Sequence, residues 1–236
     1  MFFDPLYLLF MIPGIALAFY AQWKVQSTYN KYAQVPNAHG MTGLDVARTL
    51  MRNEGLDYLG VEQIPGNLTD HYDPRGKVMR LSEGASRLPS VAAMAIVAHE
   101  LGHAVQDKQG YGWMKVRSGI VGVANIGSNF GWLLIIGGLL LGALQGSQFG
   151  FQLAIAGVVL MSAAVAFTLV TLPVEFNASS RAREMLMRNG LVTAQEAEGV
   201  RQMLNAAALT YVAAAAQAVL QLLYWVMVLS GARRSD

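Results

Sequence analysis

The 236-residue chain contains no cysteine and few charged residues. Without cysteine it has neither disulfides nor thiolate metal ligands, so any metal ion must be bound by His, Asp or Glu side chains. Charged residues form 14% of the chain, compared with about 25% in soluble domains. This deficit indicates a membrane protein. The net charge of +2 is too small to indicate nucleic-acid binding.

Long apolar runs at both ends of the chain are predicted to cross the bilayer. Residues 2–22 carry only Asp4, and they lack the basic start and small-residue cleavage site of a signal peptide. They are therefore predicted to form an uncleaved anchor. Residues 206–229 are a further predicted span; the alternative is a long amphipathic helix packed on the others.

Two uncharged runs in the middle of the chain, 119–145 and 149–172, are joined by a short link. They are predicted to form a transmembrane hairpin, which brings the number of expected spans to four. Gly127 and Gly131 lie four residues apart in the first run. This spacing favours close contact between helices in a membrane.

The basic residues indicate the orientation of these spans. If all four cross, 15 of the 17 Lys and Arg residues lie on the side that holds residues 23–118 and 173–205. An excess of basic residues marks the cytoplasmic side. We therefore expect a multi-pass cell-membrane protein with its active site facing the cytoplasm. Arg233 and Arg234 argue otherwise unless the last helix does not cross.

These patterns divide the chain into five segments. They are an anchor at 1–22, a catalytic segment at 23–118, a transmembrane hairpin at 119–172, a helical segment at 173–205, and a C-terminal helix and tail at 206–236. A helix is predicted to begin at Pro173, to break near Asn189 and Gly190, and to restart at Thr193 with Glu196 in capping-box position.

The catalytic segment contains signals for both helix and strand. Residues 43–53 are predicted to be a helix, with Thr42 as N-cap, Asp45 at capping-box spacing and Gly55 at the C-terminal cap. The runs "NLTDHY" and "KVMRLS" flank the turn sequence "DPRG", which predicts a β-hairpin. We expect "KVMRLS" to present an edge on which a peptide substrate adds as another strand.

The run "AIVAHELGHAVQD" carries the strongest chemical signal, on a helix that Ser90 is expected to cap. His99 and His103 lie one helical turn apart, so both imidazoles can reach one metal ion. Glu100 lies on the adjoining flank, where it can take a proton from an attacking water. The small Gly102 is expected to leave room for the ion and the substrate. The alternative is a core helix with incidental histidines.

A catalytic zinc ion usually has a third protein ligand. No His or Cys follows His103, so a carboxylate must serve. Glu175 is the strongest candidate because it comes directly after a predicted span, in the apolar context "LPVEFNAS". An acidic residue at such a position is costly and usually has a function. The other downstream acids that remain open as ligands are Asp107, Glu184, Glu196, Glu198 and Asp236.

"HELGH", followed after a membrane hairpin by "PVEFNASSRA", resembles the YugP-like neutral zinc metallopeptidases, a bacterial membrane family. It is more distantly similar to the HtpX-like and CAAX prenyl proteases. The run "LTDHYDPRGKVMRLSEG" also matches the family pattern, and the resemblance covers nearly the whole chain. It implies that His99, His103 and Glu175 bind one zinc ion per chain, and that Glu100 is the general base.

Further candidate residues support these four. The HtpX-like relatives have an aspartate four residues after the ligand glutamate, where this chain has Ser179. Asn177 or Ser179 is therefore a candidate for contact with a ligand histidine; the alternative is ordinary polarity at a helix start. His71 and Tyr72 in the hairpin are candidates for stabilising an oxyanion, although the sequence favours ordinary polar strand residues.

The sequence as a whole predicts a mainly α integral membrane protein with about four transmembrane helices, a zincin-like H-E-x-x-H helix and a small β-hairpin. The expected function is a zinc metalloprotease that hydrolyses peptide bonds in protein or peptide substrates at the membrane. One alternative is a metal-binding membrane scaffold or regulator without protease activity. A transporter is disfavoured, because spans two and three carry no ionisable group at the bilayer midplane. The oligomeric state does not follow from the sequence.

Overall fold

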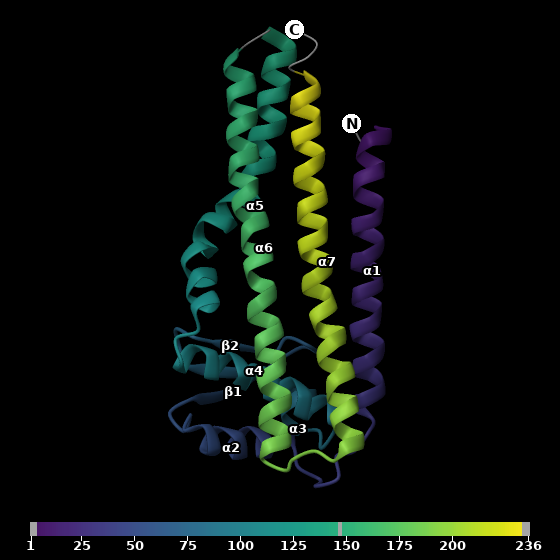
Figure 1. Cartoon of the computed structure of the whole chain (residues 1–236), viewed down its shortest axis with the longest axis vertical. Coiled ribbons are helices and arrows are strands. Elements are labelled where there is room, and N and C mark those ends of the chain that lie inside the picture. The colour runs from purple at the N-terminus through teal and green to yellow at the C-terminus, as the bar shows by residue number, and fades with distance from the viewer. Residues whose placement is uncertain (1–3, 146–147, 233–236) are drawn as a thin grey trace. The chain divides into compact units, whose positions relative to one another are not determined.

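The computed structural model describes residues 4–145 and 148–232 (Figure 1). Its helices are α1 (Pro5–Ala33), α2 (Gly43–Glu54), α3 (Glu83–Arg87), α4 (Val91–Lys108), α5 (Gly112–Gln145), α6 (Gln148–Arg188) and α7 (Ala194–Ala232). Its strands are β1 (Gly60–Ile64), β2 (His71–Asp73) and β3 (Val78–Ser82). The expected mainly α architecture is confirmed.

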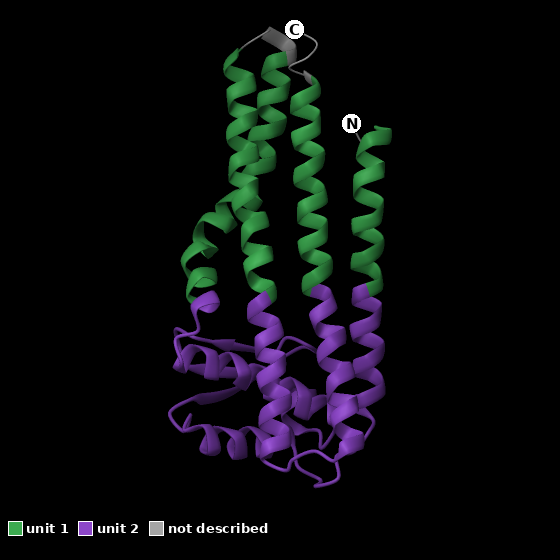
Figure 2. Cartoon of the chain, viewed as in Figure 1, with its two compact units in different colours: residues 1–20, 115–172, 211–236 green, residues 21–114, 173–210 purple. Residues whose placement is uncertain are grey.

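The chain divides into two compact units (Figure 2). Unit 1 comprises residues 1–20, 115–172 and 211–236, and unit 2 comprises residues 21–114 and 173–210. The helices α1, α5, α6 and α7 each contribute residues to both units. Unit 2 contains the three strands, the short helices and the H-E-x-x-H helix α4.

Four helices, namely α1, α5, α6 and α7, are long and apolar enough to cross a membrane, as expected. Within unit 1, α5 and α6 approach closely at glycines. A Cβ on Gly127 would lie 2.1 Å from the Leu160 carbonyl oxygen, and one on Gly131 would lie 3.0 Å from that of Gly157. The close contact predicted from the spacing of these glycines is therefore confirmed.

One predicted helix boundary is wrong. Helix α6 continues through Pro173, where a new helix was expected to begin. Proline lacks a backbone N–H, so α6 passes this residue with one helical hydrogen bond fewer, which long membrane helices tolerate. Helix α7 runs without a break through residue 206, where the last predicted segment begins. Residues 233–236, with Arg233 and Arg234, lie outside the described residues.

The predicted helix caps are confirmed. The Thr42 hydroxyl accepts a hydrogen bond from the Asp45 N–H, and the Asp45 carboxylate accepts one from the Thr42 N–H. Gly55 ends α2 with a φ of 63°, in the left-handed region that glycine tolerates. Thr193 and Glu196 form the same reciprocal pair at the start of α7. Side-chain caps of this kind satisfy backbone N–H groups that have no partner inside the helix.

The strands form one sheet in the order β1-β3-β2. Strand β2 pairs antiparallel with β3, which confirms the hairpin, and β1 adds to the other side of β3 in parallel. Strand β3 is therefore central, and the expectation that "KVMRLS" offers a free edge is wrong. The edges of the sheet belong to β1 and β2.

Helix α4 is the centre of unit 2. Of its 18 residues, 15 are buried, and it packs against α2, α3 and the sheet. This burial on all sides explains why its sequence is rich in alanine and lacks a polar face. Polar side chains on such a helix need hydrogen-bond partners.

Candidate metal centre

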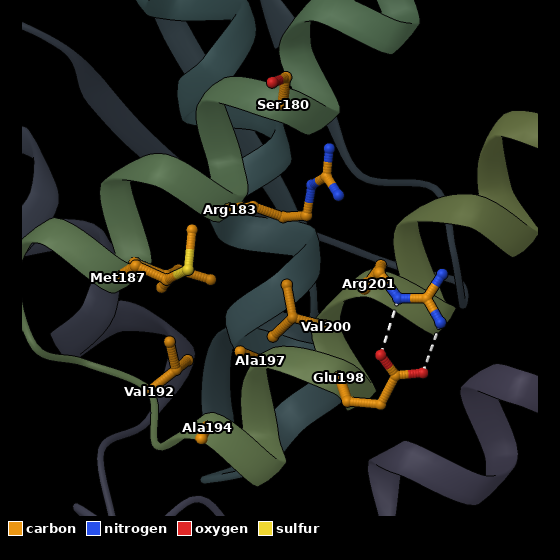
Figure 3. A pocket seen from close by; sticks show the side chains of 10 residues that line it. Ser180, Arg183, Met187, Val192, Ala194, Ala197, Glu198, Val200 and Arg201 are labelled. Atoms are coloured by element: carbon orange, nitrogen blue, oxygen red, sulfur yellow. Dashed lines mark hydrogen bonds and ion pairs between the residues drawn. The ribbon is translucent and has the colours of Figure 1, made fainter.

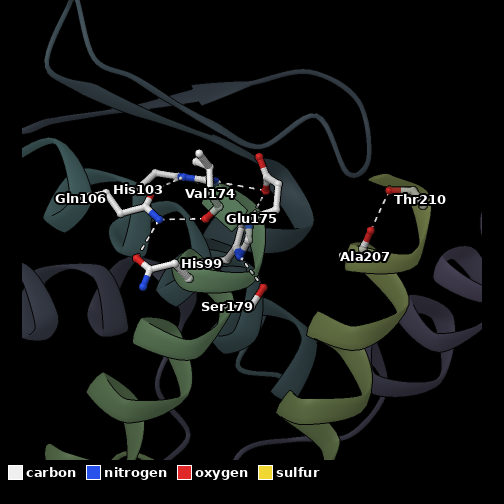
Figure 4. A network of polar contacts seen from close by, with 9 residues as sticks. His99, His103, Gln106, Val174, Glu175, Ser179, Ala207 and Thr210 are labelled. Atoms are coloured by element: carbon white, nitrogen blue, oxygen red, sulfur yellow. Dashed lines mark hydrogen bonds and ion pairs between the residues drawn. The ribbon is translucent and has the colours of Figure 1, made fainter. Parts of the chain in front are cut away.

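The structure brings three of the predicted site residues together in unit 2 (Figure 4). The Glu175 Oε2 atom on α6 lies 3.2 Å from His99 Nε2 and 3.4 Å from His103 Nε2, both on α4. One ligand atom from each residue lies within 4.8 Å of the other two. The Glu175 side chain is 2% exposed, and the two imidazoles are 12% and 10% exposed. Within the described ranges no other group of three such residues is found.

The close approach of α4 to α6 depends on the glycine of the motif. A Cβ on Gly102 would lie 2.6 Å from the Ala178 carbonyl oxygen and 3.1 Å from its Cα atom. Only glycine lets the two backbones come this near. Gly102 was expected to leave room for an ion and a substrate, but the position that a Cβ would occupy faces the backbone of α6. It therefore serves to bring Glu175 within reach of both histidines.

A buried amide holds His103 in place. The fully buried Gln106 has its Oε1 atom 3.0 Å from His103 Nδ1. Its Nε2 atom donates to the Val174 carbonyl at 2.8 Å and to Asn177 Oδ1 at 3.0 Å. Gln106 thus joins one histidine on α4 to the residue just before Glu175 on α6. Sequence reasoning missed Gln106, although a glutamine in so apolar a helix was a signal.

The two candidates for contact with a histidine differ in their positions. The Ser179 hydroxyl lies 3.3 Å from His99 Nδ1. Asn177 instead accepts hydrogen bonds from Gln106 and from the Arg181 guanidinium, whose Nε lies 2.7 Å away. Asn177 therefore reaches His103 only through Gln106.

Glu100 is buried beside the cluster, with 7% of its surface exposed. Burial raises the pKa of its carboxyl, and the neighbouring imidazoles oppose this rise when they are protonated. For His103, burial lowers the pKa, but its hydrogen bond to Glu175 and the charge of that carboxylate outweigh burial and raise it. The cluster is thus arranged to attract a positive charge.

The donor set fits a zinc ion. Two imidazole nitrogens and one carboxylate oxygen are the ligands of a common class of catalytic zinc sites. The three residues converge from two rigid helices, and both imidazole Nδ1 atoms have polar partners, which fixes the rings. Metal ions and protons compete for such imidazoles, because only the neutral ring binds a metal.

Known proteins with similar sequences are also described as zinc metallopeptidases or membrane proteases. The chain matches the family described as "Putative neutral zinc metallopeptidase" over residues 7–230. It is 43% identical over 228 residues to the "Putative membrane protease YugP" of Bacillus subtilis (strain 168), a match that covers 97% of this chain and 98% of that protein. The chain belongs to this family of zinc metallopeptidases. The resemblance seen in the sequence is thereby confirmed. No solved structure matches the chain.

The two hairpin candidates of this family member lie in strand β2. The Tyr72 hydroxyl donates a hydrogen bond to Asp107 Oδ2 at 2.7 Å. Burial, followed by this hydrogen bond, raises the pKa of Tyr72 far above its ordinary value. Its proton is therefore engaged and not free for an oxyanion. His71 is exposed, and its Nδ1 lies 2.9 Å from the Thr69 carbonyl oxygen.

The alternative third ligands have other partners. Asp107 is bound by Tyr72 and by the Lys77 ammonium. Glu184 is exposed and pairs with an arginine one turn on. Glu196 caps α7, and Glu198 forms a two-pronged pair with Arg201. Asp236 lies outside the described residues.

A pocket in unit 2 lies between α6 and α7, with a volume of about 460 Å³ (Figure 3). Arg183 and Ser180 line it, together with the ion pair of Arg201 and Glu198. It contains no histidine, and its one carboxylate is already bound by two arginine nitrogens. This pocket therefore lacks the donor set of a metal site.

Proposed function

We propose that the protein is a membrane zinc metalloendopeptidase, with one zinc ion per chain held by His99, His103 and Glu175. The single observation that carries the proposal is the convergence of these three donors, within 4.8 Å of one another, in a member of a zinc metallopeptidase family. Zinc bound there would supply a Lewis acid that polarises a peptide carbonyl and makes water more acidic.

Glu100 is the proposed general base. Its carboxylate accepts a proton from the attacking water and delivers it to the amine nitrogen that leaves. The buried position of Glu100 favours this exchange, because a raised pKa brings a carboxyl nearer to neutral pH, where it can both take and give a proton.

The neighbouring polar residues orient the ligands. Gln106 and Ser179 hold the Nδ1 sides of His103 and His99, and thereby direct each Nε2 atom toward Glu175. Asn177 supports Gln106. His71 and Tyr72 stay candidates for substrate contact only through β2, an edge strand of the sheet, to which a peptide would add by backbone hydrogen bonds.

The proposed substrate is a protein or peptide held at the membrane, cut on the cytoplasmic side. Glu175 comes three residues after the apolar run 149–172, and the basic residues favour the cytoplasm for the segments that carry the site. Both features support cleavage at the border of the membrane.

Glu100→Gln tests the reaction, and metal analysis tests the site. We expect purified native protein and Glu100→Gln to contain about one zinc ion per chain, and Glu175→Ala to contain much less. Cleavage of a casein-type substrate by detergent-solubilised protein should be lost in Glu100→Gln, because water activation needs a carboxylate. The competing function is a metal-binding scaffold without protease activity. It predicts full zinc but no cleavage by the native protein, and no difference between it and Glu100→Gln.

A further inference from the structure

Helix α5 carries polar and small side chains on its outward face in unit 1. Ser118, Gly122, Asn125 and Asn129 recur at spacings of four, three and four residues, which place them along one stripe of the helix. All four are exposed. The opposite side of α5 packs on α6 through glycines such as Gly127. We call these four residues the amide stripe.

The asparagines of this stripe lie deep in an apolar span. They are 8 and 12 residues beyond Arg117, the last charged residue before α6. At 1.5 Å per helical residue they lie about 12 and 18 Å beyond it along the helix, within a hydrocarbon core of about 30 Å. No hydrogen bond within the described chain satisfies the Asn125 side chain, and Asn129 donates only to the Asn125 backbone carbonyl, at 2.8 Å.

An unpaired amide facing lipid is costly, because hydrocarbon offers no hydrogen-bond partner. Asparagines in membrane spans are normally turned toward another helix. The exposed flank of α5 that carries Val123, Ile126 and Phe130 is apolar. On the other flank, the exposed Ser128 bonds back to the Asn125 carbonyl of its own helix. The polar groups are thus gathered where a partner helix would meet them.

We propose that the amide stripe is the interface of a parallel two-fold dimer of this chain. Two copies with the same orientation in one membrane are related by an axis along the membrane normal, which sets identical residues opposite each other. A side-chain amide has both a donor and an acceptor, so an asparagine can pair with its own copy, as Lys or Asp cannot. A Cβ on Gly122 would meet nothing within 4 Å, so the backbones are free to approach there.

This geometry selects a second copy as the occupant. A transmembrane substrate need not place an amide at the level of Asn125 and again at that of Asn129, whereas a second copy always does. The inference concerns assembly only and does not depend on the proposed protease activity.

Cysteine cross-linking tests the dimer directly, because the native chain has no cysteine. Full-length Gly122→Cys, which keeps both asparagines, is oxidised in lipid bilayers and compared with Val123→Cys, a neighbouring exposed position on another face. We expect a disulfide-linked dimer for Gly122→Cys at a yield at least tenfold above that of Val123→Cys. Equal yields, or none, would overturn the proposal.

The amides themselves are tested in the same background. Adding Asn125→Leu and Asn129→Leu to Gly122→Cys should lower the cross-linking yield at least tenfold, while α5 stays a membrane helix because leucine is more apolar. Photobleaching steps are then counted for fluorescently labelled protein that carries no Cys substitution. We expect two steps for the native chain and one step for the variant with both Asn125→Leu and Asn129→Leu. Retained dimers in that variant would show that the amides do not hold the interface.

Discussion

Replacing Gln106 by leucine tests whether the metal centre is prepared by the polar network behind it. The Val174 carbonyl can only accept a hydrogen bond, so the Gln106 amide nitrogen must face it. The Gln106 carbonyl oxygen then faces His103 Nδ1, which must carry a hydrogen. This leaves the lone pair of His103 on Nε2, the atom that lies toward Glu175. Gln106 therefore selects the tautomer of His103 that binds a metal.

The size of the effect follows from the bonds that leucine removes. Loss of such a partner behind a metal ligand typically weakens metal binding 10- to 100-fold, or by about 1.4 to 2.7 kcal/mol. The His103 Nδ1–H and the Val174 carbonyl, both in a buried setting, would also lose their partner. Each buried group left unsatisfied costs about 1 to 3 kcal/mol, so the free energy of unfolding should fall as well.

Zinc affinity, measured by competition with a chelator at fixed pH in detergent, is the assay. Gln109→Leu is the matched control, because Gln109 is exposed and its Oε1 accepts only from Arg181 Nη1 at 2.7 Å. We expect Gln106→Leu to weaken zinc binding at least tenfold and Gln109→Leu to leave it within twofold. A folded Gln106→Leu protein that binds zinc as tightly as the native chain would refute the reasoning.

The remaining predictions concern folding. Gly102→Ala should destabilise the protein by about 1 to 3 kcal/mol and lower its zinc content, because the added Cβ would lie 2.6 Å from the Ala178 carbonyl oxygen. The control is Gly112→Ala, where an added Cβ meets nothing within 4 Å. Equal thermal stability of the two variants would contradict the packing argument. The Thr42 hydrogen bonds lower the pKa of Asp45 below its ordinary value of 3.8. Their stabilisation is complete above that value and is lost as the pH falls through the lowered pKa. Thr42→Ala should therefore cost about 1 kcal/mol at pH 7 and progressively less in acid, as measured by chemical unfolding; a cost that does not change with pH would count against this capping role.

The sequence predicted those features that local rules control. The cap at Thr42 involves a residue three positions away, and the cap at Gly55 involves the last turn of the same helix. Such hydrogen bonds form wherever the helix forms. The position of Glu175 beside two histidines was also predictable, because the H-E-x-x-H spacing fixes one helix face and the chain must return to it after a hairpin. The caps depend on one helix end only, whereas the position of Glu175 also depends on the hairpin that the two uncharged runs predict.

Other features that depend on distant segments were not predictable. Strand β1 pairs in parallel with β3, and the sequence pattern of a hairpin does not predict such a parallel contact. The role of Gly102 becomes visible only when the Ala178 backbone is placed against it. Gln106 looked like one polar residue near a helix end, and its partners come from the segment at Val174 and beyond.

A single physical rule connects the buried metal centre with the amide stripe of α5. A polar group that leaves water must find a hydrogen-bond partner, whether protein or lipid surrounds it. On α4 the partner lies inside the chain, as for Gln106 with Val174. On α5 no hydrogen bond among the described residues satisfies the exposed Asn125 side chain, which lies in the uncharged run 119–145. The same rule that explains the first observation therefore requires a partner from outside the chain for the second, and a self-complementary amide makes another copy of this chain the partner that always fits.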